Sequence, residues 1–355
     1  MNTKRTAEGA ERIAAASGLR YVSDSTPGIS RRRKRGKFEY YSASNRRVRR
    51  SRELRRIAAL AIPPAYREVW ICTDPSGHLQ ATGRDARGRK QYRYHPEWHG
   101  LCDAVKFDRM IDFGRALPGL RRRLRQDLAL SDLPREKVLA LIVTLLDVTR
   151  LRIGNPEYAR DNKSYGLSTL RNRHVRFIRD GRALLRFRGK GGAAHEVVID
   201  DRRIVRLVRK CQELPGQQLF QYRDDDGTVC DIDSGQVNNY LRSIMGAEFT
   251  AKDFRTWGAT LRAIIALART PLPEPVTEKG CREQIAAAVK RVAADLRNTP
   301  AVCRKSYINP AVFDAWRAGR LPAAMSKAAN SLPRNRAEKI ALAFLQREAK
   351  RAARH

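Results

Sequence analysis

Four positions in this sequence have a residue type and a local setting that suit cleavage of a phosphodiester bond without a metal ion. Tyr307, in the segment NTPAVCRKSY, is a candidate nucleophile because a phenolate forms a covalent phosphoester that keeps the bond energy for rejoining. Arg152 and Arg255 are candidate phosphate ligands because a guanidinium stays charged and can donate two parallel hydrogen bonds. Lys190, in the segment GKGG, is a candidate acid for the leaving oxygen because neighbouring cations can lower the pKa of a lysine. Taken singly, each residue is more simply explained as a solvated charge, a turn residue or a packing residue.

The expected elements place Arg152 and Lys190 at the ends of regular structure. Residues 135–151 are apolar on nearly every face, which predicts a buried core helix that ends at Gly154, so Arg152 lies close to its C-terminal end. Three alternating segments, HVRFI, ALLRFR and HEVVI, predict a three-stranded antiparallel sheet. Lys190 then lies at the tip of a hairpin, where the glycines beside it allow the backbone to approach a ligand closely.

Two helix starts position the other two candidates. Thr250 and Asp253 have the spacing of a capping box, which puts Arg255 near the N-terminus of a helix over residues 251–269, a place that favours phosphate. Thr299 is a good N-cap and the proline after it a good first helical residue, so a helix is expected just before Tyr307.

The rest of the chain divides into a strand-rich part and a helical part. From residue 69 to residue 94, short alternating runs separated by Gly and Pro turns predict a small antiparallel sheet, and residues 96–103 are expected to lead out of it. We therefore expect an α+β protein with a small β-rich N-terminal domain over residues 1–102 and a larger, mainly α-helical domain over residues 103–355 that carries all four candidates. Further helices are expected at 201–214, 235–245, 277–297 and 310–318, with a short amphipathic helix from about residue 334.

The charge of the chain indicates a polyanionic partner. Its 355 residues include 72 Lys and Arg against 37 Asp and Glu, a net charge of +35, and a hydrophobic fraction of 42% is still enough to bury a core. Residues 31–56 hold thirteen Lys or Arg with only two Glu, and we expect them to form a solvated basic arm. No apolar run approaches the roughly 20 residues of a membrane span and the N-terminus has no signal-peptide core, so the expected location is the cytoplasm.

Several common kinds of site are disfavoured. No Ser or Thr follows Lys190, so the segment is not a Walker loop, and the chain has neither a GxGxxG fingerprint nor the clustered carboxylates of a two-metal nuclease. His95 and His99 have HxxxH spacing, but Pro96 should prevent a regular helix interior there. The six cysteines lie far apart without a CxxC pair, which favours isolated buried thiols. We therefore expect neither a metal ion nor a nucleotide cofactor.

The candidate segments, taken together, carry a family resemblance. RLRIGNPEYARDNKSYGLSTLRNRHV, FRGKGG followed by HEV, KDFRTWGAT and NTPAVCRKSY stand in the order and at the distances found in type IB DNA topoisomerases. The chain resembles most closely the small poxvirus-like and bacterial branch, whose catalytic domain is similar to that of tyrosine recombinases. The upstream segment ARGRKQYRYHPEW looks like the major-groove strand of that branch, and the resemblance covers about residues 20–320.

The resemblance implies a role for each candidate. It makes Tyr307 the nucleophile, Arg152 and Arg255 the phosphate ligands, and Lys190 the acid for the 5′ oxygen. Asn298 stands nine residues before the tyrosine, where viral and eukaryotic members have histidine. An asparagine can donate a hydrogen bond to phosphate but carries no charge, and bacterial members are similar in this respect. The implied contacts with DNA come from Arg89, Lys90, Gln91, Tyr92, Tyr94 and Lys252.

The implied activity is relaxation of supercoiled duplex DNA by transient single-strand cleavage through a 3′-phosphotyrosyl intermediate, strand rotation and religation. It would need neither ATP nor a divalent metal, and the expected enzyme is a nucleoid-associated monomer whose two domains close around the duplex as a clamp. Two alternatives stay open. A tyrosine recombinase usually carries a helical DNA-binding domain upstream, where residues 69–94 here predict strands. A non-catalytic architectural protein would fit the charge equally well.

Overall fold

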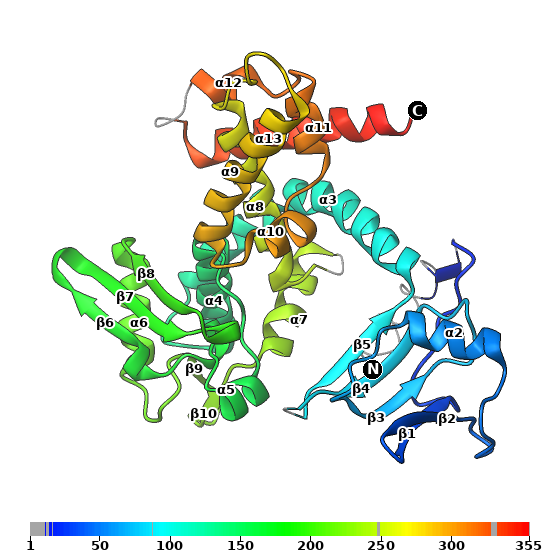
Figure 1. Ribbon diagram of the computed structural model, residues 1–355. Coiled ribbons are helices and arrows are strands. Elements are labelled where there is room, and N and C mark those ends of the chain that lie inside the picture. The colour runs from blue at the N-terminus through cyan, green and yellow to red at the C-terminus, as the bar shows by residue number, and fades with distance from the viewer. Residues whose placement is uncertain are drawn as a thin grey trace. The chain divides into compact units, whose positions relative to one another are not determined.

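The computed structural model of the protein describes residues 11, 14–15, 17–86, 88–246, 249–327 and 332–354, without the side chains of residues 99 and 101–105. The chain divides into two compact units, residues 1–107 and 108–355. From the sequence, this boundary is expected after residue 102. In the structure it falls inside helix α3 (Pro96–Leu128), which begins in the first unit and continues into the second (Figure 1).

The first unit is built on a five-stranded antiparallel sheet with the strand order β2-β1-β3-β4-β5 (Figure 1). Helix α2 (Ser51–Ala59) places Ile57 in a core with Ile29, Val69 and Ile71 from the sheet. The predicted small antiparallel sheet is confirmed, and β1 and β2, which precede residues 69–94, add two strands to it. The strands are β1 (Ile29–Lys34), β2 (Lys37–Tyr41), β3 (Arg67–Ile71), β4 (Leu79–Arg84) and β5 (Lys90–Tyr94).

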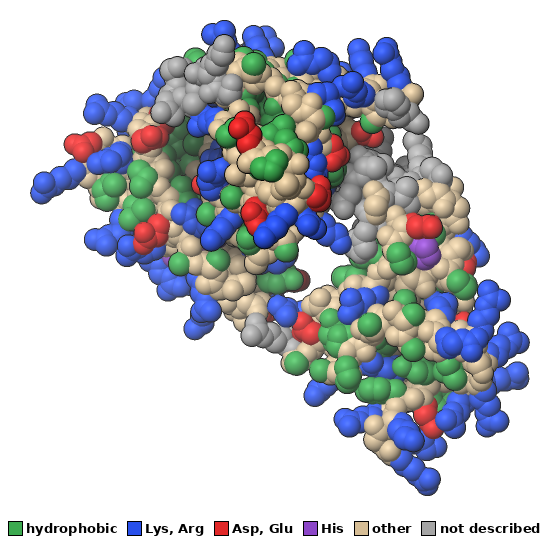
Figure 2. All heavy atoms as spheres, turned by 45° about the horizontal axis from the view of Figure 1, so that its top comes forward, with side chains coloured by type: hydrophobic (Ala, Val, Ile, Leu, Met, Phe, Trp, Pro, Cys, Tyr) green, Lys and Arg blue, Asp and Glu red, His purple; other side chains and the backbone are tan. Residues whose placement is uncertain are grey.

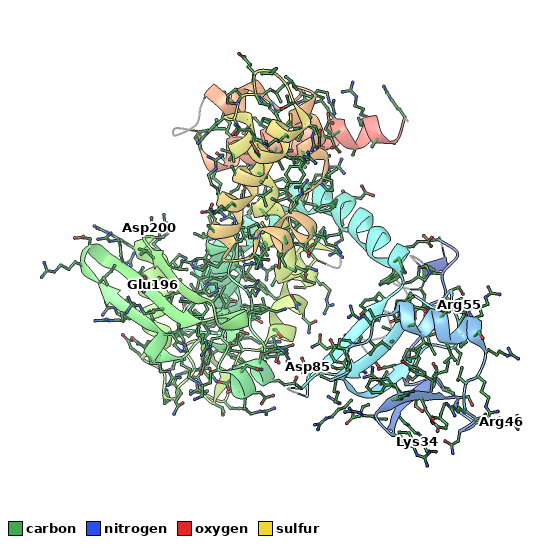
Figure 3. All side chains as sticks on the ribbon, in the orientation of Figure 1. Lys34, Arg46, Arg55, Asp85, Glu196 and Asp200 are labelled. Carbon is green, nitrogen blue, oxygen red and sulfur yellow. The ribbon has the colours of Figure 1, made fainter. Side chains whose placement is uncertain are left out.

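Residues 31–56 are folded, so the expectation of a solvated basic arm was wrong. They form most of the β1–β2 hairpin and of α2, and Tyr40 packs against the sheet core. The guanidinium of Arg31 is a structural group, since it donates hydrogen bonds of 2.8–3.1 Å to the carbonyl oxygens of Ile62, Pro63 and Tyr66. Other cations of this segment are exposed and extend from the hairpin, the following loop and the helix, as Lys34, Arg46 and Arg55 do (Figure 3). So many residues of this segment are Lys or Arg that the alternation of polar and apolar residues typical of a pair of strands could not be recognised in the sequence.

Residues 96–103 lead out of the sheet as expected, and they do so as the start of α3, a helix of 33 residues that begins at Pro96. A proline is well placed as the first residue of a helix, where its missing N–H would have no partner anyway. Pro96 therefore starts a helix instead of preventing one. The side chain of His99 lies outside the described part of the chain.

The second unit is mainly helical, and α4 (Arg135–Thr149) is its buried helix, with most of its side chains inaccessible to water. The helix ends at Thr149, before the expected Gly154, because Arg150 adopts a left-handed conformation with φ 55°. The other predicted helices are present, and the last one is longer than expected. They are α6 (Arg202–Gln212), α7 (Ser234–Met245), α8 (Ala251–Ala268), α9 (Glu278–Leu296), α10 (Pro300–Ser306), α11 (Ala311–Arg317) and α13 (Arg334–Ala352). Two further short helices, α5 (Pro156–Asn162) and α12 (Ala323–Lys327), were not predicted.

The predicted three-stranded sheet of this unit is confirmed. Strands β6 (Val175–Ile178), β7 (Arg182–Arg188) and β8 (Ala194–Ile199) pair antiparallel in the order β6-β7-β8 (Figure 1). Along β7, Leu185 and Phe187 are buried while the arginines between and after them are exposed, as their alternation predicts. A separate pair, β9 (Gln221–Arg223) and β10 (Val229–Asp231), completes the strands described in this unit.

A buried ion-pair network joins α3, α4 and α13 in the second unit. The guanidinium of Arg121 contacts Asp147 at 2.8 Å and Glu338 at 2.5 Å. Arg334 contacts both of the same carboxylates, Glu338 at 3.0 Å. The side chains of Asp147 and Glu338 are each 8% exposed, so the two arginines are their counter-ions in a place that water scarcely reaches.

Lys and Arg side chains are spread over the visible faces of both units, with few Asp and Glu among them (Figure 2). None of the described helices is both long and apolar enough to cross a bilayer. The cysteines within the described residues are free thiols, of which Cys72, Cys211, Cys281 and Cys303 are buried and Cys230 is partly exposed. The side chain of Cys102 lies outside the description.

Candidate active site

One pocket of about 300 Å³ in the second unit gathers four of the five predicted catalytic residues. The fifth, Asn298, joins them through its side-chain oxygen, which accepts a hydrogen bond of 2.5 Å from Nη2 of Arg152. The pocket also contains Lys252, which the family resemblance implies as a DNA contact. A larger pocket of about 810 Å³ lies beside the Arg121–Asp147 ion pair and contains none of the predicted site residues. The predicted residues that line the smaller pocket are Arg152, Lys190, Lys252, Arg255 and Tyr307.

Arg152 is held in place by a close crossing of two backbone segments. Beyond the end of α4, the carbonyl oxygen of Arg152 accepts a 2.9 Å hydrogen bond from the amide of Leu167. Gly154 and Gly166 make the crossing possible, since a Cβ at residue 166 would lie 2.5 Å from the amide nitrogen of Gly154. Gly154 also has φ 104°, which other residues rarely adopt. The glycine expected to end the helix thus serves the loop that carries the arginine.

Arg255 is a buried connector between three helices. The residue is 2% exposed. Its two terminal nitrogens donate hydrogen bonds to the carbonyl oxygens of Arg150 and of Leu296, the latter at 3.0 Å. It thereby joins α8 to the C-terminal ends of α4 and α9. The predicted capping box is present, with the amide of Thr250 donating to Asp253 at 2.7 Å. Each terminal nitrogen uses one of its two N–H groups in these bonds, and the buried Nε has no acceptor among the described residues, so Arg255 can still donate to a ligand.

Tyr307 lies at the C-terminal end of α10, whose N-cap is Thr299 as predicted. Its backbone oxygen accepts a 3.1 Å hydrogen bond from the hydroxyl of Thr260, and that hydroxyl accepts another of 3.1 Å from the amide of Asn309. The Arg255 guanidinium lies 5.1 Å from the centroid of the Tyr307 ring. The residue is 9% exposed, so its ring is firmly held while its edge reaches the pocket.

The electrostatic setting favours a phenolate at Tyr307. Burial alone would raise the pKa of its hydroxyl, but the positive charges of Arg255, Arg152 and Lys252 outweigh burial and leave the pKa below its ordinary value. Burial and the charge of Arg255 also lower the pKa of Arg152, while Tyr307 acts in the opposite direction. The pocket is therefore a place where positive charges are held close together without a carboxylate to neutralise them among its lining residues.

Three buried side-chain nitrogen atoms at this site have no hydrogen-bond acceptor among the described residues. They are Nη1 of Arg152, Nε of Arg255 and Nδ2 of Asn298. The amide oxygen of Asn298 faces Arg152, so its nitrogen is left to donate elsewhere. A buried donor without a partner costs on the order of 1–3 kcal/mol, and such a cost is typical of a site that awaits a ligand. The site is therefore prepared for an anion with several oxygens.

Lys190 enters the pocket from the β7–β8 hairpin, at the tip where the sequence places it. The loop of residues 189–193 closes through a 2.8 Å hydrogen bond from the amide of Gly189 to the carbonyl of Ala193. Gly191 and Gly192 have φ 73° and 81°, which explains why this tight loop is rich in glycine. The lysine itself is exposed, so its ammonium can reach a ligand in the pocket.

The other predicted DNA contacts belong to the first unit and lie on or beside β5, an edge strand. Arg89 and Gln91 both contact Asp85, which is labelled in Figure 3, at 2.7 and 3.0 Å. Lys90 is 2.5 Å from Asp24. Tyr92 is 48% exposed and stacks on Tyr94 with their centroids 6.0 Å apart. Strand alternation puts Lys90, Tyr92 and Tyr94 on one face of the strand and Gln91 on the other.

Some residues at the pocket were not predicted. Asn155 and Tyr158 follow Arg152 within the segment that carries the resemblance, so their nearness in sequence was the one available signal. Ser164 and Tyr165 also line the pocket. Thr260 does not line it, but its hydroxyl donates a hydrogen bond to the backbone oxygen of Tyr307. Nothing in the local sequence around Thr260 distinguishes it from an ordinary helix residue.

Comparison with known proteins agrees with this site. Residues 95–318 match the eukaryotic DNA topoisomerase I catalytic core, and residues 37–85 match the bacterial DNA topoisomerase IB N-terminal domain. DNA topoisomerase 1B of Acanthamoeba polyphaga mimivirus is 37% identical over 286 residues, which cover 79% of this chain and 85% of the viral protein. DNA topoisomerase 1B of Vaccinia virus (strain Copenhagen) is 22% identical over 258 residues, or 70% of this chain and 75% of the viral protein.

These matches confirm the resemblance and decide between the alternatives. A recombinase is disfavoured because the N-terminal match and the five-stranded sheet coincide where a recombinase usually has helices. A non-catalytic architectural protein is disfavoured because the catalytic-core match spans every predicted catalytic residue. The chain belongs to the type IB DNA topoisomerase family and is an isomerase enzyme.

Proposed function

We propose that this enzyme relaxes supercoiled duplex DNA through a covalent bond between Tyr307 and the 3′ phosphate of one strand. The observation that carries the proposal is the set of three acceptor-free donors, on Arg152, Arg255 and Asn298, around a buried tyrosine whose pKa is lowered. A phosphodiester supplies the oxygens that these donors lack. It also supplies the phosphorus atom that a phenolate would attack.

The first step is attack of the Tyr307 oxygen on phosphorus, with loss of the phenolic proton to water. The P–O5′ bond breaks as the new P–O bond forms, and negative charge grows on the non-bridging oxygens. Arg152 and Asn298 donate to these oxygens through Nη1 and Nδ2, and Arg255 donates through Nε while its charge stays fixed beside the ring. Fixed donors of this kind stabilise a transition state without having to reorganise.

The leaving 5′ oxygen takes its proton from the ammonium of Lys190, which reaches the pocket from the hairpin tip. Rejoining reverses both transfers: the 5′ hydroxyl returns a proton to Lys190 and attacks phosphorus, and the Tyr307 phenolate leaves. Between the two steps the free strand rotates and torsional strain is released. Because the phosphotyrosyl bond keeps the energy of the broken phosphodiester, the cycle needs no ATP.

No divalent metal is part of the proposed cycle, since the arginines supply the positive charge at phosphorus. The first unit would bind the duplex through the β5 side chains, and the two units would close around the DNA as a clamp. Lys90 and Arg89 would exchange their carboxylate partners for phosphates as DNA binds. We further propose that the enzyme acts as a monomer on chromosomal DNA in the cytoplasm.

Plasmid relaxation in the presence of EDTA, without ATP, tests the proposal. Wild-type enzyme should relax negatively supercoiled plasmid and, on denaturing gels, should leave a fraction of the DNA attached to protein by its 3′ end. Tyr307→Phe should bind the same DNA and form no adduct, because it lacks only the attacking oxygen. An adduct formed by Tyr307→Phe, or relaxation that stops in EDTA, would contradict the assignment of the nucleophile or of the metal-free mechanism.

A further inference from the structure

A buried histidine packs against the first residue of the loop that carries Lys190. His195 is on β8, is 3% exposed, and pairs across the sheet with Phe187. The two rings stack with centroids 4.8 Å apart and planes 7° apart. The ring of His174 lies 6.4 Å from that of Phe187 and in turn contacts Tyr165, which lines the pocket. A chain of ring contacts therefore connects His195 with the wall of the pocket.

The imidazole determines how close the loop can come. A Cβ placed on Gly189 would lie 2.5 Å from Nε2 of His195 and 2.6 Å from Cδ2, closer than any real contact. The backbone of Gly189 has φ −98° and ψ −166°, a conformation open to any residue. Glycine is thus required here because the ring occupies the space, and for no reason of backbone strain. The ring supports the residue that immediately precedes Lys190.

The same strand is attached to the segment that carries Asn298. The guanidinium of Arg297 donates to the carbonyl oxygen of Glu196, the residue after His195, whose place on β8 is labelled in Figure 3. On the other edge of the loop, the amide of Tyr165 donates to the carbonyl of Arg188 at 2.8 Å. The base of the loop is therefore held from both sides. The remaining freedom of its first residue is limited by the imidazole.

His195 is uncharged where it lies. Burial, together with the charges of Arg297, Arg152 and Arg255, lowers its pKa to about 4. Its Nδ1 has no hydrogen-bond partner among the described residues. The ring therefore acts through its shape: it fills the space next to Gly189 without adding a further positive charge to the site. The larger ring of a phenylalanine at this position would press on the backbone of Gly189.

We propose that His195 is a positioning residue for Lys190, which sets the height of the loop and so the distance from the lysine ammonium to the leaving 5′ oxygen. The inference rests on the proposed function, in which Lys190 gives that oxygen its proton. It predicts that a change at His195 damages proton donation and leaves the attack by Tyr307 and the binding of phosphate intact.

The test compares two substrates: a duplex with an ordinary 5′ bridging oxygen and one with sulfur in its place, a leaving group that needs no proton. The variants are His195→Ala, Gly189→Ala, the double variant, and Lys190→Ala as the reference. Each single variant should cleave the oxygen substrate up to about 100-fold more slowly than wild type, because a displacement near 1 Å can cost that much. Each should cleave the sulfur substrate at close to the wild-type rate.

The double variant gives the sharper result. Since removal of the ring makes room for the new Cβ, Gly189→Ala combined with His195→Ala should cleave the oxygen substrate faster than Gly189→Ala alone. Adding His195→Ala to Lys190→Ala should cause no further loss. A defect of His195→Ala that is equally large on sulfur would overturn the inference, as would no defect on oxygen. A misfolded variant would cleave neither substrate, and wild-type enzyme that forms no adduct on either would refute the proposed function instead.

Discussion

Tyr307 lies among positive charges that favour its ionised form, and this has a consequence for how cleavage depends on pH. The charges of Arg255, Arg152 and Lys252 together overcome the effect of burial on its pKa. Arg255 and Arg152 also make hydrogen bonds within the site, and both are proposed phosphate ligands. Lys252 is different, because it is exposed at the first turn of α8 and contributes mainly its charge.

Lys252→Gln should therefore shift the pH profile of single-turnover cleavage to higher pH. The pKa of Tyr307 is depressed by the lysine, so removal of that charge raises it, and less phenolate is present at neutral pH. Lys279→Gln, at the first turn of α9, removes an equal charge from an exposed position and should leave the profile unchanged. A profile that moves to lower pH, or moves equally in both variants, would contradict the assignment of this effect to Lys252.

The proposed contact between the amide nitrogen of Asn298 and phosphate can be measured by substitution. Asn298→Ala removes the donor and should slow cleavage by about 100-fold, the usual cost of one donor at a developing oxyanion. Asn298→His keeps a donor at this position and should lose less rate. The measurement is the single-turnover rate of adduct formation. If the two variants were equally slow, donation from Asn298 would not be its role.

At the scale of elements, the second unit depends on ionic contacts between helices that are far apart in the sequence. The α3–α4–α13 network buries Asp147 and Glu338 against Arg121 and Arg334. Burial tends to raise the pKa of each carboxyl, but the arginines outweigh it and both pKa values lie below their ordinary values. The network therefore stabilises the fold above the ordinary carboxyl range. Its contribution is lost as the pH falls through the lowered pKa values.

Asp147→Asn should destabilise the protein by up to about 3 kcal/mol at neutral pH, because two partly buried guanidiniums are left with one carboxylate fewer and solvent moderates the cost. The loss should shrink as the pH is lowered, since wild-type Asp147 then loses its charge as well. Asp180→Asn, in an exposed pair with Arg182, is the matched control and should cost less than about 1 kcal/mol. Denaturant unfolding at neutral and acid pH measures both. Equal losses in the two variants would show that the network adds nothing beyond a surface pair.

For the whole molecule, the net charge of +35 divides into cations with different duties. Some hold the fold, as Arg31 does through three carbonyl oxygens and Arg255 through two. Others are exposed and remain available to a polyanion, as Arg33 on the same strand is. Arg31 and Arg33 lie two residues apart on β1, so substituting each in turn compares a cation that holds the fold with one that is exposed.

Arg33→Gln should weaken DNA binding in a salt-dependent way and leave thermal stability unchanged. If it loses one phosphate contact, the slope of log K against log salt should fall in magnitude by about 1. Arg31→Gln should instead lower the melting temperature, because three carbonyl oxygens lose their donor. Binding at several salt concentrations and thermal unfolding distinguish the two. An unchanged slope for Arg33→Gln would mean that β1 does not contact the duplex.

Much of this could be predicted because the signals were local. The apolar run of α4, the caps of α8 and α10, and the alternation of β7 each depend on residues close together in the chain, and each is present. The order and spacing of four segments sufficed to name the family. Two expectations were wrong. The many cations of the β1–β2 hairpin obscured its strand alternation, and Pro96 was expected to interrupt a helix although it is the first residue of α3.

The sequence by itself determined which residue types serve the site and which elements carry them, since helix caps, strand alternation and glycine turns act over a few residues. Only the tertiary structure decided how those residues are used. Arg255 connects three helices because the ends of α4 and α9 meet it, and the amide nitrogen of Asn298 is left without an acceptor because Arg152 binds its oxygen. His195 supports Gly189 because two strands pair in one register. Such contacts join residues far apart in the chain, and no local pattern encodes them.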